Sequence, residues 1–445
     1  MLNRRIDLYS YDIYPKVVPV GREVTVTVQA IDPHLMQDFP YTVSLYAIND
    51  AGKVLESNLP CAPLAAPMQG FTVTVTLPKE QEYLLQITYA DKARPQANLQ
   101  FYALEDDLLC RKPLFGEFHA HSFFSDGKQG PAFLAAEYRK QGFDFLSVTD
   151  HRRRMPSILA VEAFEGLELP FKLYPGEEVH PQDIRTHIVN FASDNSANAF
   201  ALKEKDQATW RDRTGDPLWF EELERVKATL PPLPENVSPD EVASATIVSR
   251  IIREGGGMCI LAHPHWRYPL HSVTDETTRY FLQSGLFDAL ELIGGQHWSD
   301  NHSQIAYYNQ LTAEGMRIPV VGASDEHGAL PVGTPPEKCH HFTEERTLLF
   351  AKENSREGIM EAVKGCYSAA MFQPVDQFPQ ISGCSYRLFK YAMFLLLNYF
   401  PLRDELYAAE GRYMHEYAAG TPGAKEKLLR TVEDNAYFED KYFCR

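Results

Sequence analysis

The chain of 445 residues lacks the sequence features of a disulfide-rich, secreted or membrane-spanning protein. Its seven cysteines are scattered and contain no CxxC pair, so the sequence predicts no cysteine metal knuckle, and we expect reduced thiols in a cytoplasmic protein. The N-terminal residues lack the continuous apolar segment of a secretory signal. The most apolar run, YAMFLLLNYF at 391–400, is about half the length that spans a bilayer. The sequence therefore predicts no membrane segment.

Positive charge is also scarce. Lysine and arginine together number 43 against 60 acidic residues, which gives a formal charge of -17. Proteins that bind duplex nucleic acid without sequence preference neutralise phosphates with basic surfaces, so this balance argues against that class of partner. A small anionic substrate remains compatible with the charge. The hydrophobic content of 44% is that of an ordinary globular protein with a substantial core.

The chain divides by pattern into three expected parts. Residues 1–110 carry alternating, β-branched runs such as REVTVTVQAI and FTVTVTL, which predict a β-sandwich-like domain without evident chemistry. Residues 111–375 alternate strands with helices, as in a βα-repeat fold with a parallel sheet, and are interrupted by an insertion at about 193–240. Residues 376–445 predict a helical C-terminal extension rich in aromatics, which is compatible with packing on the body or with a homo-oligomer.

Seven strands are expected in the central part, with helices such as PAFLAAEYRKQG and EVASATIVSRIIREG between several of them. The strands are LFGEFHAH, FDFLSVTDH, FKLYPGEEV, HIVNFA, GMCILAHPH, DALELIG and IPVVGASDEH. Active-site residues of βα barrels gather at strand ends, and polar residues recur at the ends of these strands.

Six histidines and three carboxylates occupy those strand ends. Within GEFHAH and within ASDEH, two such side chains stand two residues apart, so they face the same side of an extended strand. Imidazole nitrogen and carboxylate oxygen are ligands that zinc, iron and manganese accept. We therefore expect one multinuclear metal site with two or three divalent ions, formed by His119, His121, Asp126, His151, Glu178, His187, His263, Asp325 and His327.

The ordered motifs HAH, SDG, TDH, GEE, HIVNF, AHPH and SDEH resemble those of the Polymerase and Histidinol Phosphatase (PHP) superfamily, over roughly residues 113–370. HAHSFFSDG and RTLLFAKENSREGIMEAVKGCYSAAM are most similar to its carbaryl-hydrolase-like branch. The resemblance implies an α/β fold of the distorted (β/α)7 barrel type and a metal-dependent hydrolase.

The resemblance also implies ligand roles. His119 and His121 would hold a first metal with Glu178 and Asp325, and Glu178 would bridge to a second metal at His187 and His263. A third metal would lie at Asp126, His151 and His327. Glu177 is an alternative to Glu178 if the strand register differs by one residue. Asp150 is expected to orient its neighbours.

The expected chemistry is hydrolysis of a small phosphate ester, with a water bridging two ions as nucleophile and with His119, His121, Glu178, His263 and Asp325 as the catalytic set. Three divalent ions would carry more charge than three carboxylates neutralise, which favours an anionic substrate. Arg152 and Arg153 could clamp a phosphate, and His180 and His265 could line the pocket or supply a leaving-group acid.

Three alternatives remain open from the sequence. The same site could hydrolyse a carbamate or carboxylic ester, or trim nucleotides or oligonucleotides if aromatic residues stack bases beside it. It could also be a non-catalytic metal-binding scaffold that organises an assembly. The complete set of nine polar groups disfavours the scaffold, because converging polar groups are costly to keep in one cavity without a use.

Overall fold

The computed structural model describes residues 5–31, 40–90, 96–202, 214–267, 273–328, 344–374 and 377–445. Its internal contacts divide the chain into two compact units. The first combines Met1–Lys112 with Ser385–Ala409 and Arg430–Arg445, and the second combines Pro113–Cys384 with Glu410–Leu429. The three-part division at 1–110, 111–375 and 376–445 stays a prediction.

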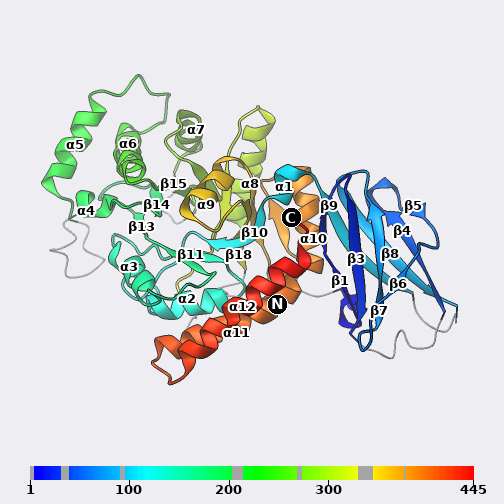
Figure 1. Ribbon diagram of the computed structural model, residues 1–445. Helices are drawn as coiled ribbons and strands as arrows, with labels where there is room; N and C mark the ends of the chain where they lie inside the picture. Colours follow the sequence, from blue (N-terminus) through cyan, green and yellow to red (C-terminus); the bar gives the residue numbers. More distant parts are fainter. Residues whose placement is uncertain are drawn as a thin grey trace. The chain divides into compact units, whose positions relative to one another are not determined.

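The first unit contains two β-sheets, drawn in blue in Figure 1. One has the order β1-β3-β7-β6 and the other the order β2-β9-β8-β4-β5. Apart from the parallel pair β2 and β9, the paired strands run antiparallel. The strands are β1 (Tyr11–Tyr14), β2 (Val17–Pro19), β3 (Glu23–Ala30), β4 (Tyr41–Ala47), β5 (Lys53–Glu56), β6 (Ala62–Pro63), β7 (Gly70–Thr76), β8 (Gln81–Tyr89) and β9 (Ala97–Leu104).

Alternation along these strands builds one core between the sheets. Side chains two apart in a strand share a face, and the buried positions of β3 and β8 follow that period. Val26 and Phe71 from one sheet and Leu85 and Phe101 from the other belong to one buried cluster. Helices α1 (Asp106–Leu109) and α10 (Tyr386–Asn398) also belong to this unit.

Helix α10 accounts for the most apolar run of the sequence. It contacts β8 and β9, and the rings of Tyr391 and Phe394 lie 5.2 and 5.3 Å from that of Tyr102. At its first turn, Arg387 pairs with Glu80 at 2.5 Å and with Asp107 at 2.6 Å. The run therefore packs on a sheet of its own unit.

The second unit is mixed α/β and contains two further sheets. The six-stranded sheet has the order β12-β11-β10-β18-β19-β20, and the five-stranded sheet has the order β13-β14-β15-β16-β17. The strands are β10 (Lys112–Glu117), β11 (Phe145–Ser147), β12 (Lys172–Tyr174), β13 (Gly176–Val179), β14 (His187–Phe191), β15 (Met258–Ala262), β16 (Ala289–Ile293), β17 (Val320–Gly322), β18 (Glu345–Ala351), β19 (Ser368–Phe372) and β20 (Gln380–Ser382).

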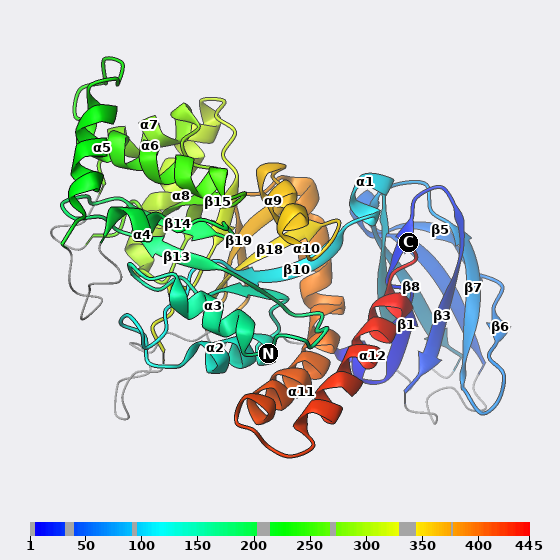
Figure 2. The same ribbon diagram turned by 60° about the vertical axis from the view of Figure 1, so that its left-hand side comes forward.

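The expectation of a purely parallel sheet is wrong for part of this unit. Strand β14 runs antiparallel to both β13 and β15, as can be followed in Figure 2. Only a short loop connects β13 to β14, whereas a parallel pair needs a crossover of a dozen or more residues. Strands β18, β19 and β20 also pair antiparallel, in a region where the sequence patterns had predicted no strand.

The two sheets of the second unit share an interior. One buried cluster takes Phe145 and Leu349 from the six-stranded sheet and Val189, Ile260 and Val321 from the five-stranded sheet. Two isolated bridges connect the two sheets: Ala120, beyond β10, pairs with Glu326, beyond β17, and His151, beyond β11, pairs with Glu178 of β13. Among the described residues no continuous ladder closes the strands into a barrel, so the (β/α)7 barrel stays a prediction.

Helices surround these sheets. Several begin at a serine, threonine or aspartate whose side chain accepts a hydrogen bond from the first turn, as Ser238 does for α6 and Asp216 for α5. The helices are α2 (Pro131–Lys140), α3 (Met155–Glu162), α4 (Ala197–Ala201), α5 (Pro217–Lys227), α6 (Pro239–Glu254), α7 (Asp275–Ser284), α8 (Trp298–Ala313) and α9 (Arg356–Lys364). Helices α4 and α5 lie in the predicted insertion, of which 203–213 is outside the described residues.

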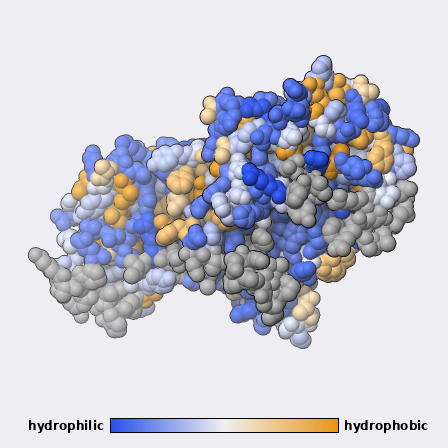
Figure 3. Space-filling view, turned by 180° about the vertical axis from the view of Figure 1, so that it is seen from behind, coloured by the Kyte–Doolittle hydropathy of each residue, from blue (hydrophilic) through white to orange (hydrophobic). Residues whose placement is uncertain are grey.

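The C-terminal region is helical. Helices α11 (Phe400–Ala418) and α12 (Ala424–Tyr442) follow each other through a short turn and lie side by side in both ribbon views (Figures 1 and 2). The space-filling view mixes hydrophilic and hydrophobic residues on the face that it shows (Figure 3). None of the helices in the described parts of the chain has the length and apolar character needed to cross a membrane.

Candidate metal centre

The topology explains why residues far apart in the sequence meet. His119 and His121 follow β10, His151 follows β11, and Asp325 and His327 follow β17. Because β14 is antiparallel to β15, its first residue pairs with the last residue of its neighbour, His187 with Ala262. The first residue of one strand and the residue that follows the other, His263, therefore lie at the same edge of the sheet.

The structure brings all nine expected metal residues together. They form overlapping groups in which the nitrogen and oxygen atoms that could bind a metal lie within 4.8 Å of one another. The groups are His121–Asp126–His151–His327, His151–His180–His187, His119–Glu178–His263 and His119–His121–Asp325. His180 is the one member that the sequence had suggested only as a substrate contact.

Glu178 lies at the centre of the cluster. Its Oε1 is 2.6 Å from Nδ1 of His187 and 3.4 Å from Nε2 of His263. Its Oε2 is 2.5 Å from Nδ1 of His151 and 3.6 Å from Nε2 of His119. Nε2 of His121 also lies 3.6 Å from Oε2. One buried carboxylate thus faces five imidazoles, which is the geometry expected of a group shared between neighbouring ions.

Glu177, the alternative ligand, faces the other side of β13. Its carboxylate accepts hydrogen bonds from the Asn190 side chain at 2.9 Å, the Ser196 hydroxyl at 2.7 Å and the backbone N–H of Ala197 at 2.7 Å. Successive side chains of a strand point to opposite faces, so only one of the two glutamates can meet the histidines. In this register that residue is Glu178.

The other two carboxylates lie among the remaining imidazoles. Oδ1 of Asp325 is 2.9 Å from Nε2 of His121 and 3.3 Å from Nε2 of His119. Asp126 lies 3.5 Å from His151 and 3.3 Å from His327. Asp325 is therefore paired with the two histidines that follow β10, and Asp126 with histidines that follow β11 and β17.

Burial and the neighbouring charged groups shift the pKa values of the carboxylates and imidazoles in the cluster. Burial would raise the pKa of Glu178, but His151, His187 and His119 outweigh it and hold the pKa well below its usual value. Burial lowers the pKa of His187 to about 4, although Glu178 opposes the shift, so this imidazole is neutral near pH 7. His327 behaves differently, because Asp126 and Asp325 overcome burial and raise its pKa to about 9.

The donor set fits divalent transition metals. Neutral imidazole nitrogens and ionised carboxylates are the forms that bind such ions. Nε2 of His119 is buried and has no hydrogen bond among the described residues, although oxygens of Asp325 and Glu178 lie 3.3 and 3.6 Å away. A cation between these three atoms would satisfy a nitrogen that the folded chain leaves unpaired.

Strained backbone marks the same strand ends. His263 has φ +27°, Asp325 has φ +48° and Arg152, next to His151, has φ +57°. A left-handed conformation costs an L-residue roughly 1–2 kcal/mol. Such strain gathers at functional sites, where side-chain chemistry decides the residue type.

This strain leads to a stability prediction. We expect the His263→Gly variant to be more stable than His263→Ala by about 1 kcal/mol, because glycine adopts positive φ without a Cβ penalty. Urea unfolding of both variants in the presence of a chelator measures the difference. As a control, Ala262→Gly in the adjacent strand should lose about 0.5–1 kcal/mol. A more stable alanine at 263 would contradict the prediction.

Asp150 organises the loop between His121 and Asp126. Its Oδ1 accepts from the backbone N–H groups of Ser122 and Ser125, both at 3.0 Å, and from the Ser125 hydroxyl at 2.6 Å. Its Oδ2 accepts from the Ser122 hydroxyl at 2.8 Å. These bonds hold the segment that carries two candidate ligands, in agreement with the orienting role expected for Asp150.

The expected substrate contacts have different environments. Arg152 is buried and donates to Nδ1 of His180 at 3.0 Å and to its carbonyl oxygen at 3.3 Å. Arg153 is partly exposed. Nε2 of His265 lies 3.2 Å from Asp275. His180 therefore joins the cluster with Arg152 behind it, while His265 belongs to none of the four groups formed by the described residues.

Two buried glutamates near the site were not singled out from the sequence. Glu291 of β16 has Oε2 at 2.8 Å from Nδ1 of His119. Glu241 of α6 accepts from the N–H of Arg185 at 2.7 Å and from the N–H of Thr186 at 3.0 Å, directly before His187. The sequence carried a signal for the first, since Glu291 is the single charged residue in an otherwise apolar strand.

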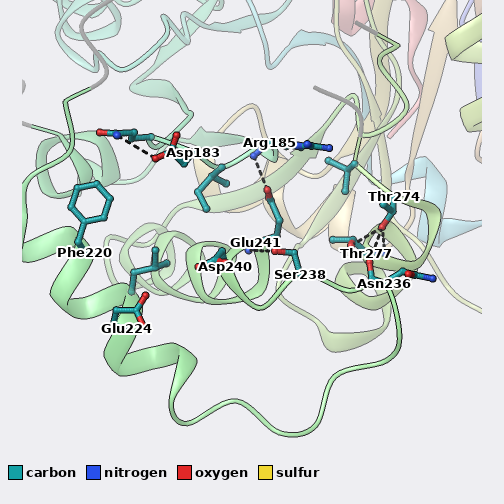
Figure 4. A pocket seen from close by; sticks show the side chains of 14 residues that line it. Asp183, Arg185, Phe220, Glu224, Asn236, Ser238, Asp240, Glu241, Thr274 and Thr277 are labelled. Carbon is teal, nitrogen blue, oxygen red and sulfur yellow. Dashed lines mark hydrogen bonds between the residues drawn. The ribbon is translucent and has the colours of Figure 1, made fainter. Parts of the chain in front are cut away.

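A cavity of about 550 Å³ is lined in part by the loop that Glu241 holds (Figure 4). Asp183 and Arg185 line it from the loop, Phe220 from α5 and Thr274 from the start of α7. The close-up shows the hydrogen bond from Arg185 to Glu241 at its wall. The insertion supplies part of the lining, and no candidate metal ligand lines the cavity.

Comparison with known proteins gives remote structural likenesses. No family model matches the chain, and no match was found among curated proteins. A two-domain protein from Bacteroides vulgatus, which contains a predicted PHP-like metal-dependent phosphoesterase, is 21% identical over 59% of this chain, with a TM-score of 0.39. The match spans 66% of that protein.

Two shorter proteins are similar over 51% of this chain at 19% identity. One is a proposed metal-dependent phosphoesterase from Bifidobacterium adolescentis, covered to 92% with a TM-score of 0.33. The other is an amidohydrolase from Chromobacterium violaceum with bound sulfate and no metal, covered to 90% with a TM-score of 0.32. At these identities and TM-scores, the likeness by itself assigns neither fold nor activity.

Proposed function

We propose that the chain is a metal-dependent hydrolase that acts on a small phosphate ester. The observation that carries the proposal is the convergence of six imidazoles and three carboxylates, from strand ends spread between residues 119 and 327, into overlapping groups of metal-binding geometry. Burying so many polar groups in one place is costly, and metal ligation is the use that suits this combination of side chains.

The ions would be divided among the nine residues as follows. His119, His121 and Asp325 would hold one ion, with Glu178 shared with a second ion near His263. His187 would serve the second ion, and Asp126, His151 and His327 would hold a third. Bound divalent ions of this kind make a water molecule acidic enough to attack near neutral pH and stabilise charge that develops on phosphate oxygens.

The chain's own charges are compatible with an anionic substrate. Asp126, Glu178 and Asp325 supply three negative charges, fewer than two or three divalent ions would bring. Burial raises the pKa of neighbouring Glu117 to about 8, so this carboxyl adds little negative charge near pH 7. Arg152 lies beside His180 and adds a fixed positive charge at the edge of the cluster.

His180 lies closer to the cluster than His265, but burial, His187 and Arg152 lower the pKa of its imidazole well below the usual value, which does not suit a leaving-group acid. Its ring centroid lies 3.9 Å from that of His187, whereas His265 lies beside Asp275 and 5.3 Å from the Tyr307 ring. We propose that Arg152 holds His180 toward the substrate and that Arg153 is available to bind a phosphate oxygen.

We also propose that the chain is a member of the PHP superfamily and that its second unit is a distorted (β/α)7 barrel. The PHP motifs occur in their expected order, and the two sheets share a buried cluster and two isolated bridges, as strands near barrel closure would. The more specific likeness to the carbaryl-hydrolase-like branch rests on the motif sequences alone.

Aromatic side chains beside the site favour one alternative substrate, a nucleotide or oligonucleotide. Phe123 lies in the loop between His121 and Asp126, is 54% exposed and stacks on Phe124 with 4.3 Å between the ring centroids. The Trp266 ring lies 5.5 Å from that of His263. Exposed aromatic rings next to a phosphate site are suited to stacking a base.

The proposal is tested by metal content and hydrolysis together. Protein purified without chelator should contain two or three transition-metal ions per chain and should hydrolyse aryl phosphate monoesters. Chelation should abolish turnover, and zinc, manganese or iron should restore it. A panel that adds short oligonucleotides, carbamates and aryl carboxylic esters separates the substrate classes. Full metal content with no turnover would indicate the scaffold, and a chain still metal-free after reconstitution would overturn the proposed function.

A further inference from the structure

Glu291 is a charged residue inside a fully buried strand. All five residues of β16 are buried, and the other four are apolar. An isolated carboxylate in such a place costs several kcal/mol or more unless a polar partner compensates it. The contact that the structure provides is Nδ1 of His119, 2.8 Å from Oε2 of Glu291.

We infer that Glu291 is a positioning residue that holds the His119 ring for metal binding, an inference that rests on the proposed function. When the ring binds a metal through Nε2, its proton lies on Nδ1, and this N–H donates to Oε2 of Glu291. Nε2 then keeps its lone pair, and this nitrogen faces Asp325 at 3.3 Å and Glu178 at 3.6 Å. Carboxylates behind metal-binding histidines fix the tautomer and raise ligand basicity in this way.

Helix α8 holds Glu291 in place. The Gln304 side chain donates to the backbone carbonyl of Glu291. The Asn301 side chain accepts from the N–H of Gly294 at 3.0 Å and donates to its carbonyl at 2.7 Å. A Cβ at Gly294 would collide with Oε1 of Glu291 and with the Gln296 side chain. The carboxylate therefore has little freedom to leave His119.

The first test is the Glu291→Gln variant, which keeps the shape of the side chain but replaces the carboxyl group with an amide. Cobalt or zinc titration of chelator-treated protein should show one ion bound about 10–100-fold more weakly than in the wild type. The visible absorption of bound cobalt should change as well, since it reports the ligand set. Chemical unfolding of the metal-free variant measures its structural effect separately.

Glu345→Gln is the matched control. Glu345 is also a buried strand glutamate, and burial together with Glu344, Glu117 and Glu326 raises its pKa well above the usual value. Glutamine there replaces one neutral side chain with another, away from the His119 ring. This control should leave metal affinity unchanged.

Gly294→Ala is a second variant in case Glu291→Gln does not fold. Its added methyl group should push the Glu291 carboxylate from His119 and weaken the same ion. If the wild type binds metal and both Glu291→Gln and Gly294→Ala bind it as tightly as Glu345→Gln does, the positioning role is wrong while the proposed function stands. If the wild type binds no metal, the proposed function itself fails.

Discussion

Replacing Glu178 with glutamine is expected to remove at least one metal ion per chain and with it the hydrolytic activity. Its carboxylate oxygens lie between 2.5 and 3.6 Å from nitrogens of five histidines. Removing a residue that only hydrogen-bonds a metal ligand typically lowers metal affinity or activity by about 10–100-fold. Because Glu178 is expected to bind the metal directly, we expect Glu178→Gln to lower metal affinity by at least about 100-fold. Elemental analysis and metal titration measure the effect.

The adjacent residue provides the control. Glu177 is equally buried but bonds Asn190, Ser196 and the N–H of Ala197 on the opposite face of β13. Glu177→Gln should keep the metal and lower stability by about 1.5–3 kcal/mol, the usual worth of a hydrogen bond to a charged group. The reverse outcome, metal lost at 177 and kept at 178, would show that the strand register is shifted by one residue.

Replacing Glu410 with glutamine is expected to destabilise the second unit by about 3–5 kcal/mol, because it removes the closer of two carboxylate partners of a buried arginine, the other being Asp144 at 3.7 Å. Nη2 of Arg139 in α2 lies 2.9 Å from Oε2 of Glu410 in α11, and neither side chain is exposed. The guanidinium also donates to the carbonyl of Phe143 at 2.9 Å, so it cannot turn to solvent without losing a second contact. Chemical unfolding measures the loss.

Glu416→Gln on the same helix is the matched control. Glu416 pairs at 3.0 Å with Lys427, whose side chain is 51% exposed. An ion pair of this kind contributes about 0–1 kcal/mol. Equal effects of the two variants would show that the Arg139 pair is solvated. Arg139→Met combined with Glu410→Leu should recover part of the stability, because both members of the closer pair are then apolar. Asp144, whose Oδ1 lies 3.7 Å from Nη1 of Arg139, keeps the hydrogen bond that it accepts from the N–H of Phe115.

Much of the candidate site was predictable from local sequence. HAH at 119–121 and SDEH at 324–327 follow apolar strands, and polar residues at the end of buried strands are brought to one edge by any sheet that pairs those strands. The nine residues expected to bind metal are the nine that the structure groups, with His180 added. The positions of the seven expected strands were predictable from local sequence as well, because short β-branched and apolar runs are typical of buried strands.

Other features depended on contacts between distant residues. Whether Glu177 or Glu178 faces the histidines is a question of register, and the register is set by pairing with β14. The role of Glu291 needed His119, which stands 172 positions away along the chain. The burial of Arg152 behind His180 was hidden by a sequence, HRRR, that reads equally well as a solvated basic loop.

The sequence by itself determined which side chains can bind a metal and that they lie at strand ends. Ligand type is a property of each side chain, and strand periodicity is a local feature of the sequence. The tertiary structure alone decided how those side chains are shared and supported. It turned β14 antiparallel so that His187 meets His263, selected Glu178 over Glu177, and placed a carboxylate behind His119. These outcomes depend on packing and pairing over long separations, where a shift of one residue moves a side chain to the opposite face.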